Sequence, residues 1–307
     1  MIKGVFSVDK LGKKKIDKLL ELRVNAVFVG HKNLIRDLVN KLRNKNIKIY
    51  VEVSVFAGKE LWQEYPAARP VDENGRLMKR VDWYAGVCPN HPKIRKERLY
   101  LIKSIIKDYD IDGIWLDFIR YPCHWEVPGP DLTEYCFCST CLGKFSKEIG
   151  GRPAGKRWIK WKCNRITSFV TEVWNLINQG RKEIKLGIFS VPWREEDFNG
   201  AITKVVGQDF KSLAKYIDIF SPMVYHKMCG QTTKWIHGII SYMNKVTGKP
   251  TLPIIQTEDR PEKIQTEEFG EEINEAVKKP SKGVIIFFLE DLLRDKNKNR
   301  VVKEIFK

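Results

Sequence analysis

Several features that would assign this chain to a familiar class are missing from its 307 residues. No segment approaches the ~20 consecutive apolar residues that a membrane-spanning helix requires. Residues 1–9 read as a short strand with no apolar signal region before them. No serine or cysteine nucleophile motif is present, and residues 8–12 are not the glycine-rich phosphate loop of a doubly wound sheet. We therefore predict a soluble, cytoplasmic protein.

Negative charge is scarce relative to positive charge. The chain has 55 Lys and Arg residues against 38 Asp and Glu residues, which gives a formal net charge of +17. Such an excess favours nucleic acid or another anionic partner. The basic residues, however, are spread over predicted helix faces and turns, where exposure to solvent explains them. Nucleic-acid binding is therefore the less favoured alternative, and the richness in Lys, Glu and Ile is typical of thermophilic surfaces.

Hydrophobic periodicity alternates between strand and helix eight times. Strict alternation predicts a parallel sheet, and eight strands are the number that closes a barrel. The expected strands are residues 3–8, 26–29, 47–56, 112–122, 185–191, 217–225, 252–256 and 283–289. The sequence thus predicts an α/β fold, a (β/α)8 TIM barrel with enlarged loops after strands three, four and five. Residues 1–307 are expected to form a single domain, with a cysteine-bearing insertion at about 123–160.

The fourth predicted strand carries a carboxylate in an otherwise apolar run, Asp112-Gly-Ile-Trp-Leu-Asp-Phe-Ile-Arg-Tyr-Pro122. Alternation along the strand places Trp115 and Asp117 on one face, which would point into the barrel. A buried carboxylate is costly unless it is paired or used. Active sites of (β/α)8 barrels lie at the C-terminal ends of the strands, so Asp117 is our first candidate for a catalytic nucleophile or base. The alternative is a structural carboxylate bonded to Arg120 or to a strand-end amide.

Carboxylates and aromatic residues also follow the other predicted strands. Glycoside hydrolysis needs this combination, because an acid and a base or nucleophile act on a sugar held by flat apolar faces. For the acid we expect Glu195 or Glu196, with Glu258 and Glu290 in reserve; an ion pair is the alternative role of each. Glu52 in strand three is more simply a buried glutamate bonded to a Tyr or Arg. The candidates for substrate binding are Asp82, Trp83, Arg120, Tyr121, Trp125, Trp193, Tyr225, His226, Glu258 and Glu290.

Three of the seven cysteines, Cys136, Cys138 and Cys141, form a C-x-C-x-x-C cluster. Without a secretory signal, clustered thiols favour a metal over disulfides. A structural zinc requires four ligands in a tetrahedron, so a fourth must come from elsewhere. Cys88 is preferred, because its loop after strand three neighbours the loop after strand four. The alternatives are Cys123, Cys163 or His124 as the fourth ligand, or three reduced thiols without a metal.

Two segments resemble signatures of glycosyl-hydrolase-like barrel families. The segment from Asp112 to Pro122 is similar to their strand-four signature, Asp-Gly-x-x-x-Asp-x-x-Arg-x-Pro. The segment Tyr216-Ile-Asp-Ile-Phe-Ser-Pro-Met-Val-Tyr225 is similar to their strand-six signature. With the eight βα units, the resemblance covers most of the chain. It implies a carbohydrate-active barrel with Asp117 near the catalytic centre.

The segment Cys88-Pro-Asn-His-Pro92, the cluster from Cys136 to Cys141 and Phe145 resemble the glycoside hydrolase family 42 β-galactosidases. In that family one upstream cysteine and such a cluster hold a structural zinc, so the resemblance implies the same four ligands here. Those enzymes end strand four with Asn-Glu, whose Glu is the acid, whereas this chain reads Phe118-Ile-Arg120. The resemblance therefore carries over the zinc ligands and not the catalytic pair.

A chitinase-type motif, Asp-Gly-x-Asp-x-Asp-x-Glu, also lacks its acid, since Trp115 and Ile119 stand at two of its acidic positions. The sequence as a whole predicts a glycoside hydrolase or close relative that acts on an oligo- or polysaccharide by paired-carboxylate catalysis. It would hold a structural Zn²⁺ and no organic cofactor. The rivals are a non-catalytic carbohydrate-binding barrel and, less favoured, a nucleic-acid-binding protein. No membrane partner is expected, and a homo-oligomer is compatible with the sequence.

Overall fold

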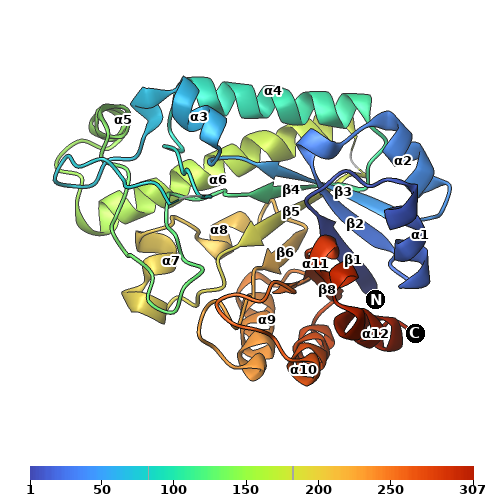
Figure 1. Ribbon diagram of the computed structural model, residues 1–307. Helices are drawn as coiled ribbons and strands as arrows, with labels where there is room; N and C mark the ends of the chain where they lie inside the picture. Colours follow the sequence, from blue (N-terminus) through green and yellow to red (C-terminus); the bar gives the residue numbers. More distant parts are fainter. Residues whose placement is uncertain (82, 182) are drawn as a thin grey trace.

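The computed structural model describes residues 1–81, 83–181 and 183–307. Eight parallel strands form one sheet in the order β6-β5-β4-β3-β2-β1-β8-β7 (Figure 1). They are β1 (Ile2–Ser7), β2 (Ala26–Gly30), β3 (Lys48–Ser54), β4 (Gly113–Asp117), β5 (Lys185–Ser190), β6 (Ile219–Pro222), β7 (Ile254–Gln256) and β8 (Gly283–Phe287). The parallel bridges Phe220–Thr251 and Met223–Ile254 join β6 to the β7 side and complete the ring. The predicted (β/α)8 barrel is confirmed.

Helices surround the strands on the outside of the barrel (Figure 1). They are α1 (Lys13–Glu21), α2 (Arg36–Arg43), α3 (Lys59–Glu64), α4 (Pro92–Asp108), α5 (Ser139–Glu148), α6 (Gly155–Gly180), α7 (Ala201–Lys204), α8 (Phe210–Leu213), α9 (Thr233–Thr247), α10 (Thr266–Val277), α11 (Leu289–Arg294) and α12 (Lys296–Ile305). Each longer helix buries one face; α2, for example, buries Leu38, Val39 and Leu42 and exposes Lys41. In the described part of the chain, no helix is long and apolar enough to cross a membrane.

Trp115 fills the interior of the barrel. Its fully buried ring lies 5.1 Å from that of Phe28 and 4.6 Å from that of Tyr50, measured between centroids. The indole N–H donates to Ser221 Oγ at 3.0 Å. The neighbouring strand β5 makes room for the ring with Gly187, where a Cβ would lie 2.1 Å from it. Trp115 therefore faces inward as the alternation predicts, and the side chain two residues later on β4 faces the same way.

The strands that are shortened most relative to the prediction are β4 and β6, for local reasons. β4 ends at Asp117 because Phe118 has a φ of +50°, which a strand cannot accommodate. β6 ends at Pro222, which has no N–H to donate to a neighbouring strand. The residues that follow each strand therefore leave the sheet early and surround the end of the barrel.

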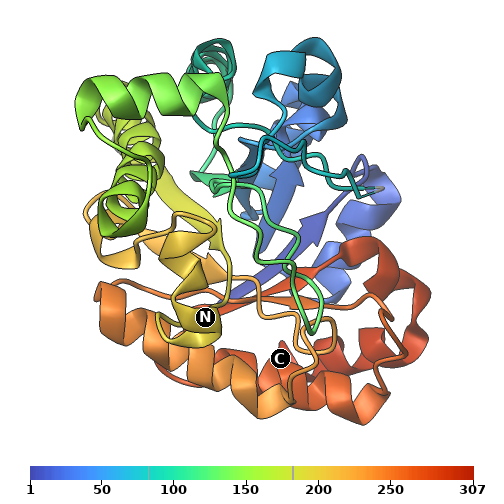
Figure 2. The same cartoon turned by 90° about the vertical axis from the view of Figure 1, so that its left-hand side faces the viewer.

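Long connections follow β3, β4 and β5, as predicted, and contain α3, α5 and α7 respectively. Figure 2 shows the segment after β4, in green, lying across the end of the barrel. The insertion predicted at about 123–160 overlaps the first residues of α6, which begins at Gly155. Trp158 and Trp161 lie three residues apart and are both buried on one face of α6. Their burial stabilises the first turns of this helix.

Candidate active site

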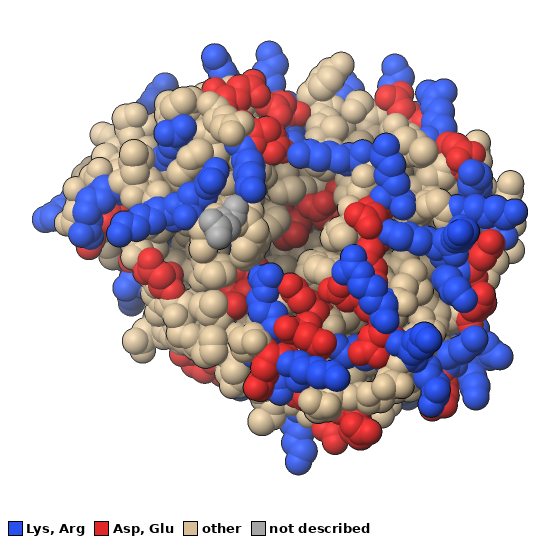
Figure 3. All heavy atoms as spheres, in the orientation of Figure 1, with Lys and Arg blue, Asp and Glu red and all other residues tan. Residues whose placement is uncertain are grey.

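A cavity of about 280 Å³ lies at the C-terminal end of the barrel. Its walls are mostly apolar, and aromatic residues from several strands contribute to them: Phe6, Phe118, Phe189, Tyr225, Phe287 and Phe288. Besides Tyr225, the charged or titratable side chains in the wall are Asp117, His124, Glu126, Glu258 and Arg260. Figure 3 shows a hollow in one face of the molecule with acidic side chains inside it. Apolar walls with a few convergent polar groups are the usual form of a small-molecule site.

Asp117 enters this cavity from the end of β4 and is 18% exposed. The Phe118 N–H donates to its Oδ1 at 2.6 Å, and Arg120 Nη1 lies 3.9 Å from the same oxygen. Burial raises the pKa of Asp117 to about 6, although Arg120 and the Phe118 N–H act in the opposite direction. At neutral pH the carboxylate is therefore mostly ionised, yet more basic than an exposed aspartate. Both properties suit a nucleophile or a base.

Glu126 lines the same cavity and was not selected from the sequence. Its side chain is 12% exposed, and its Oε2 has no hydrogen-bond partner among the described residues. Burial raises the pKa of Glu126 to about 7; the charge of Asp117 adds to this effect and Arg120 opposes it. The carboxyl group is therefore about half protonated near pH 7, as a general acid requires.

Glu126 was missed because it lies in an irregular loop, where hydrophobic periodicity carries no information. The available signal was its position: a carboxylate in the loop leaving the strand that carries Asp117, directly after His124 and Trp125. A loop residue of this kind reaches the barrel mouth through tertiary contacts, which the sequence does not reveal.

Arg120 lies behind Asp117 and is 1% exposed. Its guanidinium carbon is 4.8 Å from the ring centre of Phe118 and 5.9 Å from that of Tyr84. Among the described residues, none of its three guanidinium nitrogens has a hydrogen-bond partner. A buried guanidinium needs a compensating anion, so Arg120 partly offsets the rise that burial causes in the pKa of Asp117 and of Glu126. The predicted contact of Arg120 with substrate is not supported, since Arg120 does not line the cavity.

Glu52 provides a third buried acid near Asp117. It is 8% exposed on β3 and lines a second cavity of about 270 Å³, which shares Phe6 with the first. Burial, and then the charge of Asp117, hold the pKa of Glu52 well above its ordinary value. Ser54 and His31 line the same cavity. Both effects favour the protonated form of Glu52.

Glu195 and Glu196, the acids predicted from the sequence, are exposed in the loop after β5. The Asp197 carboxylate accepts a hydrogen bond from the Arg194 N–H at 2.7 Å, and the Glu195 N–H donates to the Tyr242 hydroxyl at 2.8 Å. The first bond lies within the loop, and the second holds the loop against α9. In the described part of the chain, neither glutamate is in the wall of the cavity that contains Asp117. Neighbouring strands bring loops together, but the direction of each loop depends on such local bonds.

Glu290, another predicted ligand of substrate, is paired within the protein. It accepts hydrogen bonds from Ser7 Oγ and from Lys15 Nζ, both at 2.7 Å. Burial acts to raise the pKa of Glu290, but the bonds from Lys15 and Ser7 hold it below its ordinary value. The salt bridge considered as an alternative role for this residue is therefore present.

His226 is similarly enclosed, at 1% exposure. Its Nε2 lies 3.1 Å from Glu268 and its Nδ1 lies 3.3 Å from Glu272, both on α10. Burial acts to lower the pKa of His226, but these two carboxylates raise it above the ordinary value. The predicted contact with substrate is not supported, because the imidazole joins the loop after β6 to α10.

Among the other predicted ligands, three line the cavity. Trp83 is 44% exposed, and its ring lies 5.5 Å from that of His124. Tyr225 stacks on Phe287 at 5.4 Å between ring centroids. Glu258 pairs with Arg260 at 2.8 Å. Asp82 lies outside the described residues.

The remaining three aromatic candidates lie elsewhere. Tyr121 is fully buried, and its hydroxyl accepts a hydrogen bond from Asn90 Nδ2 at 2.8 Å. It therefore packs inside the protein and does not face the cavity. Trp125 and Trp193 line a separate cavity at the neighbouring part of the rim.

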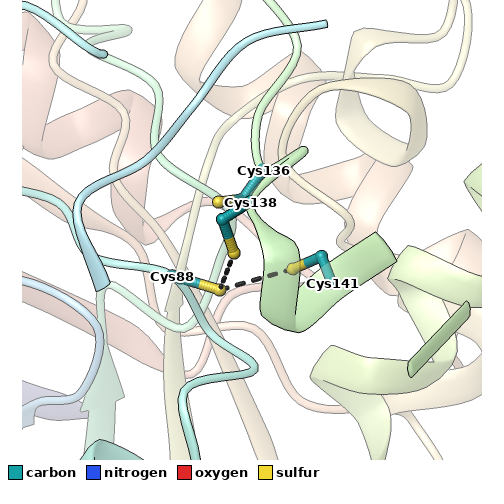
Figure 4. Close-up of side chains that lie close together, drawn as sticks. All are labelled: Cys88, Cys136, Cys138 and Cys141. Atoms are coloured by element: carbon teal, nitrogen blue, oxygen red, sulfur yellow. Dashed lines mark hydrogen bonds between the residues drawn. The ribbon is translucent and has the colours of Figure 1, made fainter. Parts of the chain in front are cut away.

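Cys88, Cys136, Cys138 and Cys141 come together as predicted (Figure 4). All four are buried, and their sulfur atoms lie within 4.8 Å of one another. Cys88 Sγ is 3.4 Å from that of Cys141 and 3.6 Å from that of Cys138. Four sulfurs on a tetrahedral metal with bonds of ~2.3 Å lie about 3.8 Å apart. The cluster therefore has the ligand number and the dimensions that a four-coordinate metal ion requires.

Asn90 supports the cluster from the side. Its backbone N–H donates to Cys88 Sγ at 3.4 Å, and its Nδ2 donates to Cys141 Sγ at 3.2 Å. Its Oδ1 accepts from Arg165 Nε on α6 at 3.0 Å. Hydrogen bonds to sulfur stabilise thiolates and orient them for a metal. The loop after β3 is thereby joined to the loop after β4 and to α6.

Residues 14–275 match the family model described as "Putative glycosyl hydrolase domain" (DUF4015). The chain belongs to this family. The matched residues include the barrel strands from β2 to β7, the carboxylates of the cavity and the cysteine cluster.

Two curated proteins are similar in sequence to this glycosyl hydrolase domain. It is 25% identical over 177 residues to the glycosyl hydrolase YngK of Bacillus subtilis (strain 168). It is 24% identical over 202 residues to an S-layer-related protein of Niallia circulans. The matches cover 50% and 53% of this chain but 32% and 12% of the relatives. The chain thus spans less than a third of the length of either relative.

Solved structures resemble this glycosyl hydrolase domain in fold. The glycoside hydrolase domain of PgaB (BpsB) from Bordetella bronchiseptica matches with a TM-score of 0.74 over 98% of both chains, at 12% identity. A β-galactosidase from the psychrophilic Marinomonas ef1 matches with a TM-score of 0.75 over 100% of this chain and 59% of that chain, at 9% identity. At such identities the likeness is one of fold.

Proposed function

We propose that this domain hydrolyses glycosidic bonds in an oligo- or polysaccharide, with Asp117 as nucleophile or base and Glu126 as general acid. The observation that carries the proposal is a pair of buried carboxyl groups in one cavity whose pKa values are about 6 and about 7. Near neutral pH one group is mostly ionised while the other retains a proton. Glu126 would protonate the leaving oxygen while Asp117 attacks the anomeric carbon or activates water.

The surroundings of the two carboxyl groups support this division of roles. Arg120 provides a buried positive charge that favours an ionised carboxylate beside it, and Asp117 lies 3.9 Å from that charge. Trp83 is 44% exposed and offers a flat apolar surface for a sugar ring. Glu258 and Arg260, in the wall of the same cavity, offer hydrogen-bonding groups for hydroxyls. The family and the fold of the glycoside hydrolase neighbours agree with the proposal.

The two rival functions have less support. A non-catalytic carbohydrate-binding barrel would keep the aromatic walls without a working acid, whereas Glu126 supplies a carboxyl group suited to that role. Nucleic-acid binding would need a contiguous basic face. On the face drawn in Figure 3, basic and acidic side chains are interspersed.

A screen for released reducing ends tests the proposed function. The intact protein is incubated with a panel of polysaccharides and aryl glycosides, and the Asp117→Asn variant serves as the inactive control. We expect product from at least one substrate with the parent and none with the variant. A protein that binds a panel member but releases nothing from it would instead be a carbohydrate-binding barrel. Equal product from parent and variant would remove Asp117 from the mechanism.

We further propose that the four clustered cysteines hold a structural zinc ion. Four sulfur ligands leave no open position, so the metal would connect two loops and take no part in the chemistry. Metal analysis of protein purified without added metal should find about one zinc per chain. Cys141→Ser should lose the metal, whereas Cys163→Ser, at a buried cysteine outside the cluster, should keep it. Metal-free parent protein would contradict the assignment.

Residues 1–307 are proposed to act as one catalytic domain in the cytoplasm, where reduced thiols persist. All seven cysteines are free in the structure. Two further predictions from the sequence are retained: a surface of thermophilic type and the formation of a homo-oligomer.

A further inference from the structure

A separate aromatic cavity of about 260 Å³ lies beside the candidate active site. It is formed by the loops after β4, β5 and β6 and by α9. Three of its aromatic side chains are Trp193, Phe198 and Trp235, and three polar ones are Arg194, Asp197 and Gln231. Cavities for drug-sized ligands usually measure ~300–1,000 Å³, so this one has room for a single sugar ring.

The packing of the protein does not explain why Phe198 is both exposed and in a strained backbone conformation. It is 41% exposed, and its backbone has φ and ψ of 50° and 42°, the left-handed conformation. This conformation costs a residue with a Cβ roughly 1–2 kcal/mol. Phe198 packs on Trp193 at 5.0 Å between ring centroids, but the exposed part of its ring covers nothing. Strained residues that bury little surface are concentrated at binding sites.

A second observation concerns Trp125, which also lines this cavity. Trp125 is fully buried, and its indole N–H has no hydrogen-bond acceptor among the described residues. Buried indole N–H groups usually have a partner. Trp125 also stacks on Tyr225 at 5.9 Å with an interplanar angle of 16°, and Tyr225 lines the cavity of Asp117. One layer of two parallel rings therefore separates the two cavities.

We propose that this aromatic cavity binds a pyranose unit of the same glycan chain that is held at Asp117. This inference rests on the proposed function for the identity of its ligand. The rings of Phe198, which is 41% exposed, and of the partly buried Trp235 would contact the apolar face of the sugar. The planar polar groups of Arg194, Asp197 and Gln231 would take up its hydroxyls. The site would select chains over single sugars, because only a chain reaches both cavities.

Oligosaccharide binding to cavity variants tests this site. The probes are cellotetraose, xylotetraose, galactotetraose and chitotetraose, titrated by calorimetry into the Asp117→Asn protein so that no hydrolysis occurs. Trp235→Ala and Phe198→Gly are added separately to this background. The matched control is Trp174→Ala, which removes an indole that is 38% exposed on α6.

We expect at least one tetrasaccharide to bind, and each cavity variant to weaken that binding about tenfold, which is ~1.4 kcal/mol. Trp174→Ala should keep the parent affinity. Phe198→Gly relieves the left-handed backbone, so its melting temperature should equal or exceed that of the parent even though affinity falls. Parent affinity in both cavity variants, or no binding of any probe, would overturn the inference. If both cavity variants bind the tetrasaccharide more weakly but the unsubstituted protein hydrolyses no substrate, the aromatic site stands and only the proposed function is refuted.

Discussion

The ends of β4 and β8 carry buried carboxylates in similar positions on the barrel, but their partners differ. Glu290, after β8, accepts hydrogen bonds from Ser7 and Lys15, and its pKa is lowered. Asp117 and Glu126, at β4 and in the loop after it, have raised pKa values. Glu126 Oε2 has no hydrogen-bond partner among the described residues, and its neighbour His124 Nε2 is 3.9 Å away. A paired carboxylate stabilises the fold. A buried carboxylate with few partners costs stability and points to chemistry.

Among substitutions that compare the carboxylates at β4 with Glu290 after β8, Asp117→Asn should have the largest effect on activity. Removal of the nucleophile or base should lower kcat/KM roughly 10⁴-fold, measured with a substrate found in the screen. Because the carboxylate is buried with its charge only partly balanced, the amide should leave the melting temperature unchanged or raise it. A variant with a few-fold loss of activity and a large loss of stability would place Asp117 in the same class as Glu290.

Glu126→Gln should have a smaller effect, roughly 10²-fold on kcat for natural glycosides, because protonation of the leaving group is lost. Aryl glycosides with acidic phenol leaving groups need little protonation, so their hydrolysis should be much less affected. Glu290→Gln provides the matched control, since Glu290 is paired with Ser7 and Lys15 and does not line the cavity. If kcat falls by the same factor for substrates with all leaving groups, Glu126 is not the acid.

The pH dependence of kcat/KM should be bell-shaped. Activity requires an ionised Asp117 and a protonated Glu126, so it should fall below about pH 6 and above about pH 7, tenfold per unit well outside these values. The two groups interact, so the apparent values belong to the pair. Glu126→Gln should remove the alkaline limb. A rate that keeps rising above pH 8 would exclude this assignment.

Glu290→Gln should show the smallest effect on activity and a moderate effect on stability. Removal of a charge that is hydrogen-bonded to Ser7 and Lys15 should lower the unfolding free energy by about 1–3 kcal/mol at pH 7. Since the pKa of Glu290 is lowered in the folded state, its contribution is present above 4.5, the ordinary value, and is lost as the pH falls further. The melting temperatures of parent and variant should therefore converge in acid. A constant difference across pH would show that the ionised carboxylate contributes no stability.

Much of this arrangement could be predicted from the sequence. The eight strands followed from periodicity, and the position of Asp117 followed from alternation on β4. The joining of Cys88 to the cysteine cluster followed from the order of the loops around a barrel. Glu126 and the separate aromatic cavity could not be predicted, because both depend on the paths of irregular loops. Glu195 shows the same limit: its loop is adjacent to the site, but a hydrogen bond to Tyr242 holds it outside.

The cysteine cluster also closes a ring in the chain. A metal bound by Cys88 and Cys141 would join residues that are 53 positions apart, and α4, β4, Asp117 and Glu126 all lie within that interval. A cross-link of this span disfavours the unfolded chain by about 4 kcal/mol. The two carboxyl groups would thus belong to a segment that is tied at both ends by an exchangeable ion. The supply of that ion, as well as temperature, would then set the lifetime of the active arrangement.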